Sequence, residues 1–179
     1  ADNEAPPMGG ALAVGGGGVT GTNNVVADNM LAGAGVYLSG GHLTASHWTL
    51  VNNGRCGMVA DLGIDVGSGS ITLCRSIITS HKSGLCGAGV MAEQNLFHRV
   101  DRPCMAGASC VSNLLGDPQF VDPLAHDYHI TADSAAVDRA HGVDVLSDMD
   151  GDMRPVGTAA DIGADEIEPY RIYLPLVLR

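Results

Sequence analysis

The chain has 179 residues, of which 45% are hydrophobic and only 4% aromatic, and its formal net charge is −11. This length accommodates one domain and excludes a multidomain machine. Nine Lys and Arg against 20 Asp and Glu would repel nucleic acids and anionic membrane surfaces, so neither is predicted as a partner. No apolar run reaches the roughly 20 residues that cross a bilayer, so no transmembrane segment is predicted.

The chain begins with a short, Pro-containing polar stretch, ADNEAPPM, over residues 1–8. Such a start is typical of a secreted chain after signal-peptide cleavage. We therefore expect an extracellular or cell-surface protein whose first eight residues form an N-terminal arm.

The first half of the chain contains an internal repeat of short apolar runs separated by Gly-rich turns. A shift of 24 residues places Val19 on Leu43 and Asn29 on Asn53, and a further shift of 28 places Leu43 on Ile71. Units of this length bury their apolar residues only by stacking on one another. Because Val, Ile, Leu and Thr alternate in these runs, each unit is predicted to consist of strands. The predicted fold class is all-β: a right-handed parallel β-helix, or solenoid.

Five cysteines are present, and none lies in a Cys-x-x-Cys pair or beside a regularly spaced His. A zinc site at these cysteines is therefore poorly supported. A disulfide between Cys86 and Cys104 is favoured over one between Cys104 and Cys110, because it would close a Gly-rich segment. The alternative is that all five thiols are buried as small hydrophobic groups.

Catalytic groups are sparse in the repeat region. The carboxylates between residues 9 and 97 fall on different repeats: Asp28, Asp61, Asp65 and Glu93. A glycosidase needs two carboxyl groups at a defined separation, and a polyuronate lyase needs a base together with cationic groups. The protein is therefore predicted not to be an enzyme, with a polysaccharide lyase or hydrolase as the alternative.

Acidic residues become frequent after about residue 101. The sequence NLLGDPQFVDP at residues 113–123 is followed by DMDGDMRP at 148–155 and DIGADE at 161–166. This ending resembles the closing segment of secreted bacterial right-handed parallel β-helix repeat proteins of the choice-of-anchor class. The resemblance implies an architecture and an extracellular setting but no reaction, because one fold supports many functions.

The acidic segment is expected to cap an open end of the solenoid, since acidic, Pro-containing turns oppose edge-to-edge strand pairing. Arg154 is predicted to be buried in a bidentate ion pair with neighbouring carboxylates. The first alternative is a calcium site, because Asp148, Asp150 and Asp152 alternate as oxygen ligands around Gly151. The second is a solvated acidic turn. No other metal or cofactor is predicted.

The C-terminal tail carries a large apolar side chain at every even position: Tyr170, Ile172, Leu174, Leu176 and Leu178. This pattern predicts an apolar strand that either folds back along its own sheets or is donated to a neighbouring copy. The open ends of a solenoid also favour end-to-end stacking of copies, which propagates into a filament. Self-association through the tail or through the ends is therefore expected.

Together these features predict a noncatalytic, extracellular structural or adhesive protein, with a filament subunit as one form of its assembly. A carbohydrate-active or glycan-binding protein with surface glycans as partners is the alternative, and the aligned Thr20, Thr44 and Thr72 offer a small glycan- or ice-binding face. The expected divisions are an arm over residues 1–8, solenoid coils over 9–112, an acidic capping segment over 113–168 and an apolar strand over 169–179.

Overall fold

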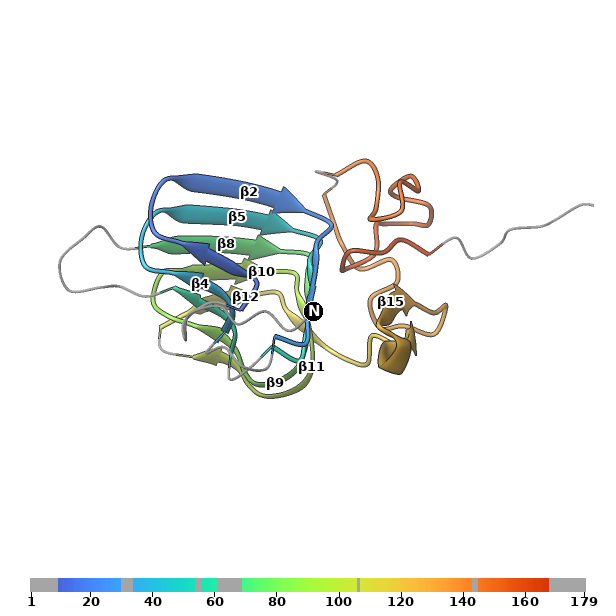
Figure 1. The fold of residues 1–179 in the computed structure, drawn as a ribbon. Coiled ribbons are helices and arrows are strands. Elements are labelled where there is room, and N and C mark those ends of the chain that lie inside the picture. Colours follow the sequence, from blue (N-terminus) through green and yellow to red (C-terminus); the bar gives the residue numbers. More distant parts are fainter. Residues whose placement is uncertain are drawn as a thin grey trace, which may run out of the picture.

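The structure of the protein is a computed structural model that describes residues 10–29, 34–53, 56–60, 69–105, 107–142 and 145–167. Within these residues the chain forms 15 strands and one short 3-10 helix, so it is all-β. Strands of the first part stack in parallel, and an irregular C-terminal lobe, residues 116–167, lies beside the stack (Figure 1).

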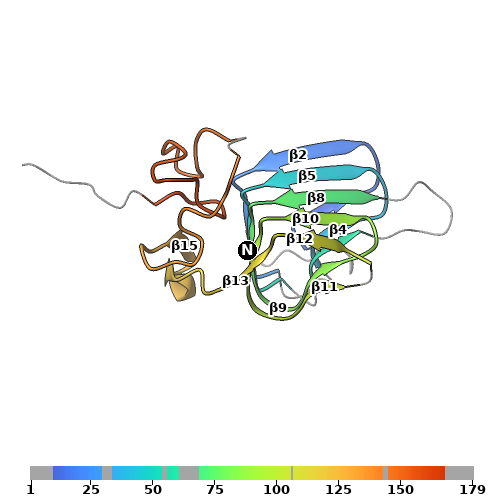
Figure 2. The same ribbon diagram turned by 180° about the vertical axis from the view of Figure 1, so that it is seen from behind.

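The first parallel sheet has five strands that follow one another through successive repeats (Figure 2). Its strands are β2 (Gly18–Thr22), β5 (His42–Ser46), β8 (Ser70–Cys74), β10 (Val90–Glu93) and β12 (Ser109–Val111). Val19 pairs with Leu43, and Leu43 pairs with Ile71. The register predicted from the repeat is therefore confirmed.

The second parallel sheet has eight strands: β1 (Leu12–Val14), β3 (Val25–Ala27), β4 (Ala34–Leu38), β6 (Thr49–Val51), β7 (Cys56–Ala60), β9 (Ile77–Cys86), β11 (Leu96–Met105) and β13 (Leu114–Leu115). Strand β9 has ten residues. Its first part pairs with β6, and its last part pairs with β7. Two rows of short strands are thereby joined into one sheet.

The predicted fold class, a single right-handed parallel β-helix with an acidic cap and a terminal strand, needs correction. The all-β class holds, but the strands divide into parallel sheets of eight and five strands and a separate two-stranded sheet. The long strands β9 and β11 fuse neighbouring rows, and the lobe adds the antiparallel pair β14 (Phe120–Asp122) and β15 (Asp127–Ile130). The predicted terminal strand lies outside the described residues.

The acidic segment does not cap the stack but docks along its side. Its backbone groups bond to the side chain of one residue in each of four successive repeats: Asn23, Thr49, Arg75 and Gln94. These residues lie in or next to the corners that join the two sheets. Asn23, Arg75 and Gln94 have positive φ, and such corners carry polar groups that the strand ladders do not use. The lobe satisfies these groups, which explains its lateral position.

The interior between the sheets consists of stacked aliphatic side chains. Leu43, Ile71 and Ile78 are at most 1% exposed, and each buried side chain of this size contributes roughly 2 kcal/mol. The main core cluster, as described, contains two rings, those of Trp48 and Phe97. Trp48 directs its Nε1 to the carbonyl of Gly21 (2.9 Å), so it is a core residue rather than an exposed ligand platform.

Polar ladders line the corners of the stack. Asn29 Nδ2 donates to Asn53 Oδ1 (2.8 Å), which confirms the predicted pair. The Asn53 backbone N–H in turn donates to His81 Nε2 (3.0 Å). At the other corner, Asn95 Oδ1 accepts from the backbone of Ser76, and Asn113 Oδ1 accepts from the backbone of Asn95. These side chains satisfy backbone groups where the sheets end, as buried polar groups require.

A disulfide joins Cys104 to Cys110, so the predicted bridge between Cys86 and Cys104 is wrong. In the parallel ladder Cys104 lies opposite Leu85, and Cys86 lies opposite Met105. Cys86 and Cys104 are therefore offset by one residue, and an offset of one turns side chains to opposite faces. Cys86 is itself disulfide-bonded, and Cys74 is the free cysteine among the described residues.

We predict that Asn53→Ala lowers the free energy of unfolding by about 2–3 kcal/mol, because it leaves buried polar groups without partners. Asn53 is fully buried, donates to Val26 O and accepts from Asn29. The control is Asn52→Gly, which removes one exposed bond to Asp28, tolerates the positive φ of this corner and should cost less than about 1 kcal/mol. Urea unfolding measures both variants, and equal losses would contradict a role for the ladder.

Candidate functional site in the C-terminal lobe

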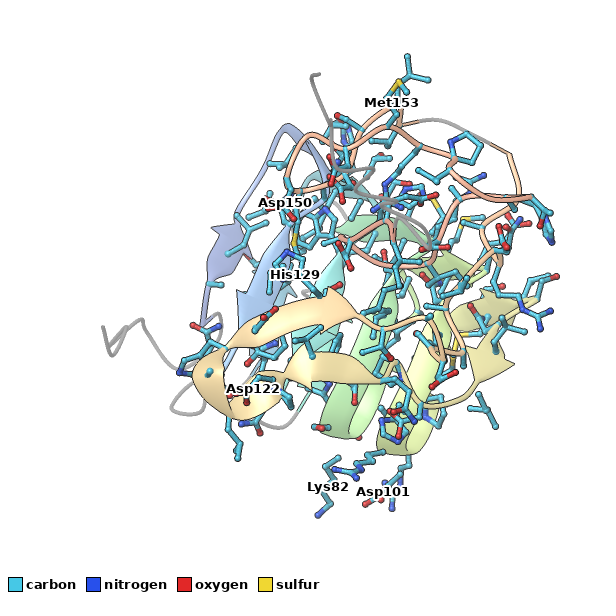
Figure 3. The ribbon with its side chains drawn as sticks, turned by 90° about the vertical axis from the view of Figure 1, so that its right-hand side faces the viewer. Lys82, Asp101, Asp122, His129, Asp150 and Met153 are labelled. Carbon is cyan, nitrogen blue, oxygen red and sulfur yellow. A yellow bond between two sulfur atoms is a disulfide. The ribbon has the colours of Figure 1, made fainter. Side chains whose placement is uncertain are left out.

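Strand β15 presents polar side chains to the irregular loops of the lobe. Along this strand Tyr128 and Ile130 are buried, whereas Asp127 and His129 are half-buried. The alternation of a strand thus places His129 on the opposite face from the core residues. Figure 3 shows His129 near Asp150, which comes from the loop that follows.

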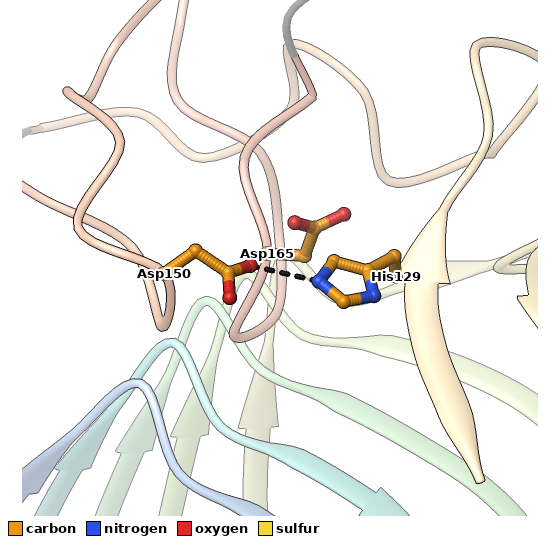
Figure 4. A group of neighbouring side chains, drawn as sticks. All are labelled: His129, Asp150 and Asp165. Carbon is orange, nitrogen blue, oxygen red and sulfur yellow. Dashed lines mark hydrogen bonds and ion pairs between the residues drawn. The ribbon is translucent and has the colours of Figure 1, made fainter.

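Both ring nitrogens of His129 contact carboxylates. Nδ1 lies 2.5 Å from Asp127 Oδ1, and Nε2 lies 2.7 Å from Asp150 Oδ2 (Figure 4). The hydrogen bond with Asp127, reinforced by Asp150 against the opposing effect of burial, raises the pKa of His129 to about 9. The same bond lowers the pKa of Asp127. At neutral pH His129 is therefore an imidazolium that donates from both nitrogens.

Asp165 completes this cluster from a third segment. Its side chain is buried, and its Oδ2 accepts from the backbone N–H of Ile130 (2.7 Å). Burial raises the pKa of Asp165, opposed by the Ile130 bond and by the positive charge of His129. One potential ligand atom from each of His129, Asp150 and Asp165 lies within 4.8 Å of the others (Figure 4). We refer to these three residues as the His129 cluster.

Of the predicted calcium ligands, only Asp150 belongs to the His129 cluster. Asp148 is buried, and its Oδ1 accepts from the backbone N–H groups of Asp150 and Asp152, both at 2.9 Å. Its Oδ2 accepts from the N–H of Glu166 (3.0 Å). Asp148 thus shapes the loop backbone, and Asp152 follows it in the same turn. The sequence spacing of these three Asp residues reflects that turn, while His129 and Asp165 were not recognisable as their neighbours.

Arg154 is buried, as predicted, but its contacts differ from the expected bidentate pair with a nearby Asp. Nη1 donates to Asp161 O (2.9 Å) and Glu166 Oε2 (3.3 Å), and Nη2 donates to Gly163 O (2.9 Å). Burial raises the pKa of Asp161 to about 6, and its carboxylate accepts from two backbone N–H groups. The guanidinium therefore fastens the last described segment of the lobe through its carbonyls.

We predict that Arg154→Met destabilises the protein by about 3–5 kcal/mol, because it leaves the buried Glu166 carboxylate without its cation. Arg139→Met is the control, since Arg139 is exposed on the same lobe and its loss should cost little. Urea unfolding followed by circular dichroism measures both. A loss no larger than that of the control would show that Arg154 is not a central contact of the lobe.

A polar groove of about 520 Å³ separates the hairpin β14–β15 from the stacked strands. One wall consists of corner residues from four successive repeats: Asp28, Asn52, Ser80 and Arg99. The other wall includes Asp117, Phe120 and Tyr128 from the lobe. Asp28 lies in the repeats and Asp117 in the lobe, far apart in the chain, so no signal in the sequence indicated that both line one groove.

The surroundings of Asp28 do not favour a role for this residue as a catalytic acid. Burial alone raises the pKa of Asp28, but hydrogen bonds from Asn52, Tyr128 and His126 outweigh it and hold the pKa below its usual value. Asn52 Nδ2 lies 2.7 Å and Tyr128 Oη 2.8 Å from this carboxylate. A glycosidase acid needs a raised pKa. Asp28 is instead an ionised acceptor that ties the hairpin to the stack.

Comparisons of the chain with protein-family models, with curated proteins and with solved structures found no match. The resemblance of the C-terminal segment to choice-of-anchor proteins therefore stays a prediction from its residues. No helix in the described part of the chain has the length and hydropathy to cross a membrane. The tail residues predicted for assembly lie outside the described residues: Tyr170, Ile172, Leu174, Leu176 and Leu178.

The raised pKa of His129 makes a pH-dependent contribution to stability. Because the folded pKa of about 9 exceeds the ordinary value of 6.5, the stabilisation is fully present below about pH 6.5 and is lost as the pH rises through 9. The His129 side chain is 43% exposed, so solvent screening limits the effect to roughly 1 kcal/mol or less.

We predict that His129→Gln lowers the free energy of unfolding at pH 6 and has much less effect at pH 10. Urea unfolding of the wild type and the variant at both pH values measures the difference, and the comparison cancels groups that titrate in both proteins. A loss that is the same at both pH values would show that the ring contributes only packing.

Proposed function

We propose that the protein is a noncatalytic structural or adhesive protein of the cell surface or extracellular space, and that it self-associates through the edges of its parallel sheets. The observation that carries this proposal is the exposure of the last repeat. Strands β12 and β13 are the terminal strands of the two sheets, and no further strand of the described chain pairs with them. The lobe occupies the side of the stack instead of this end.

These terminal strands have the properties of a pairing surface. Strand β12 reads Ser-Cys-Val and β13 reads Leu-Leu; both are short, but neither carries the Lys or Pro that blunts many natural edges. Val111 and Leu115 are 55% and 80% exposed. An unpaired strand edge with exposed apolar side chains is a template for a strand of another chain.

The direction of the strands determines the form of such an assembly. Every pairing in the two large sheets is parallel, and the first repeat presents β2 as the opposite terminal strand of its sheet. The last repeat of one copy would therefore meet the first repeat of the next. This contact is heterologous, and a heterologous contact that does not close generates a filament.

Two further observations support a structural role outside the cytosol. The buried carboxylates Asp148, Asp161, Asp165 and Glu166 all accept hydrogen bonds from backbone N–H groups, so they act as scaffold groups. The disulfide between Cys104 and Cys110 is of a type that persists in oxidising compartments.

A glycan-binding role is the second candidate function, and the polar groove favours it. Its volume of about 520 Å³ lies within the range of small-molecule sites. Asn52, Gln119 and Arg99 line it with amide and guanidinium groups, which bond to hydroxyl-rich ligands. Titration with plant and bacterial oligosaccharides, followed by NMR, would separate this role from a purely structural one.

We predict that Val111→Lys abolishes self-association, because a charge on β12 opposes strand pairing. Val121→Lys is the matched control: Val121 is likewise 55% exposed but belongs to β14, outside both parallel sheets. Electron microscopy and sedimentation velocity of the full chain report filaments and oligomers. Assembly by the Val111 variant, or a wild type that stays monomeric at high concentration, would overturn the proposed mode of association.

A further inference from the structure

We infer that the His129 cluster binds one divalent metal ion of the zinc class. The ion would join three segments of the lobe that lie far apart in the sequence. His129 comes from β15, Asp150 from the turn that Asp148 organises, and Asp165 from the segment that Arg154 holds. This inference does not depend on self-association, because the cluster lies in the lobe and not at a sheet edge.

The donor set indicates the class of ion. It comprises one imidazole nitrogen and two carboxylate oxygens, with atoms within 4.8 Å of one another. Imidazole and carboxylate are common zinc ligands, at about 2.0–2.2 Å from the ion, whereas calcium prefers six to eight oxygen ligands. Asp148, the first residue of the predicted calcium set, is not part of this cluster, and both of its oxygens accept from backbone N–H groups. The geometry therefore favours a transition metal over calcium.

His129 has the orientation of a metal-ligating histidine. Its Nδ1 contacts Asp127 Oδ1, which leaves Nε2 directed toward Asp150 (Figure 4). Histidine ligands usually donate the N–H of their second nitrogen to a carboxylate, which fixes the ring. Asp127 would hold the ring in this way while Nε2 coordinates. Since a coordinating imidazole is neutral, the ion replaces the proton on Nε2 and binding releases it.

The carboxylate of Asp165 is largely buried but only partly hydrogen-bonded. The residue is only 6% exposed, and its one hydrogen bond within the described chain is from the N–H of Ile130 to Oδ2. Its second oxygen has no hydrogen-bond partner there and is not one of the fully buried unpaired atoms of the described chain, so it stays open to an incoming ion. The positive charge of His129 already opposes the effect of burial on this carboxylate. A metal ion between Asp150 and Asp165 would replace that single charge with a double one, because the ion displaces the Nε2 proton of His129.

The site would remain accessible to solvent. The side chains of His129 and Asp150 are 43% and 51% exposed, so an ion can enter from the surface and water can complete its coordination. Binding to the folded lobe alone adds to stability by mass action. We therefore expect the metal to raise the unfolding temperature of the lobe.

The test is titration of the metal-free full chain with zinc chloride, with manganese and calcium chlorides in parallel, followed by calorimetry and thermal unfolding. We expect one zinc ion per chain, a higher unfolding temperature and a weaker response to calcium. Asp150→Asn should weaken zinc binding by roughly tenfold or more. Asp133→Asn is the matched control, because Asp133 is an exposed carboxylate of the same lobe and its loss should leave binding unchanged.

A second readout uses cobalt in place of zinc, because a cobalt ion held by nitrogen and oxygen ligands absorbs visible light. We expect a saturable spectrum in the wild type and its loss in His129→Gln. If that variant does not fold, Asp150→Asn decides, since this side chain is half-exposed. The inference is overturned if the wild type binds no zinc, or if Asp150→Asn and Asp133→Asn bind it equally, which would assign binding to other histidines.

Discussion

In-register pairing of equivalent strands is the constraint on which the rest of the structure depends. Val19, Leu43 and Ile71 lie beside one another because their strands pair in parallel, residue for residue. A slip of one residue would turn every apolar side chain to the solvent face. The aliphatic interior therefore enforces the register, and the register in turn places the corner residues of successive repeats above each other. The lobe residues that bond to those corners must therefore match the spacing between repeats.

The corners explain why the lobe lies on the side of the stack. Residues such as Asn23, Arg75 and Gln94 adopt positive φ there, and their side chains offer polar groups that the strand ladders do not use. The lobe supplies partners for these groups. This lateral docking creates the polar groove between the corners and the hairpin, and it leaves the terminal strands β12 and β13 available for the proposed association.

The lobe is held together by polar contacts as much as by apolar ones. Its small core, built around Ile130 and Ile162, is accompanied by buried carboxylates that accept from backbone N–H groups. The irregular backbone has no neighbouring strand to accept its N–H groups, so these carboxylates accept them instead. The cost is buried negative charge, which Arg154 offsets near Glu166. Near Asp165 the corresponding cation is His129, whose proton the proposed metal ion would replace.

The sequence by itself determined what repeats: the strand character, the pairing of Val19 with Leu43, and the polar bond between Asn29 and Asn53. It also indicated that Arg154 is buried. Only the tertiary structure decided the division into two sheets, the bridge from Cys104 to Cys110, and the meeting of His129 with Asp150 and Asp165. The reason is physical: stacking imposes a period that a sequence displays, whereas contacts between irregular loops follow from chain paths that leave no period to read.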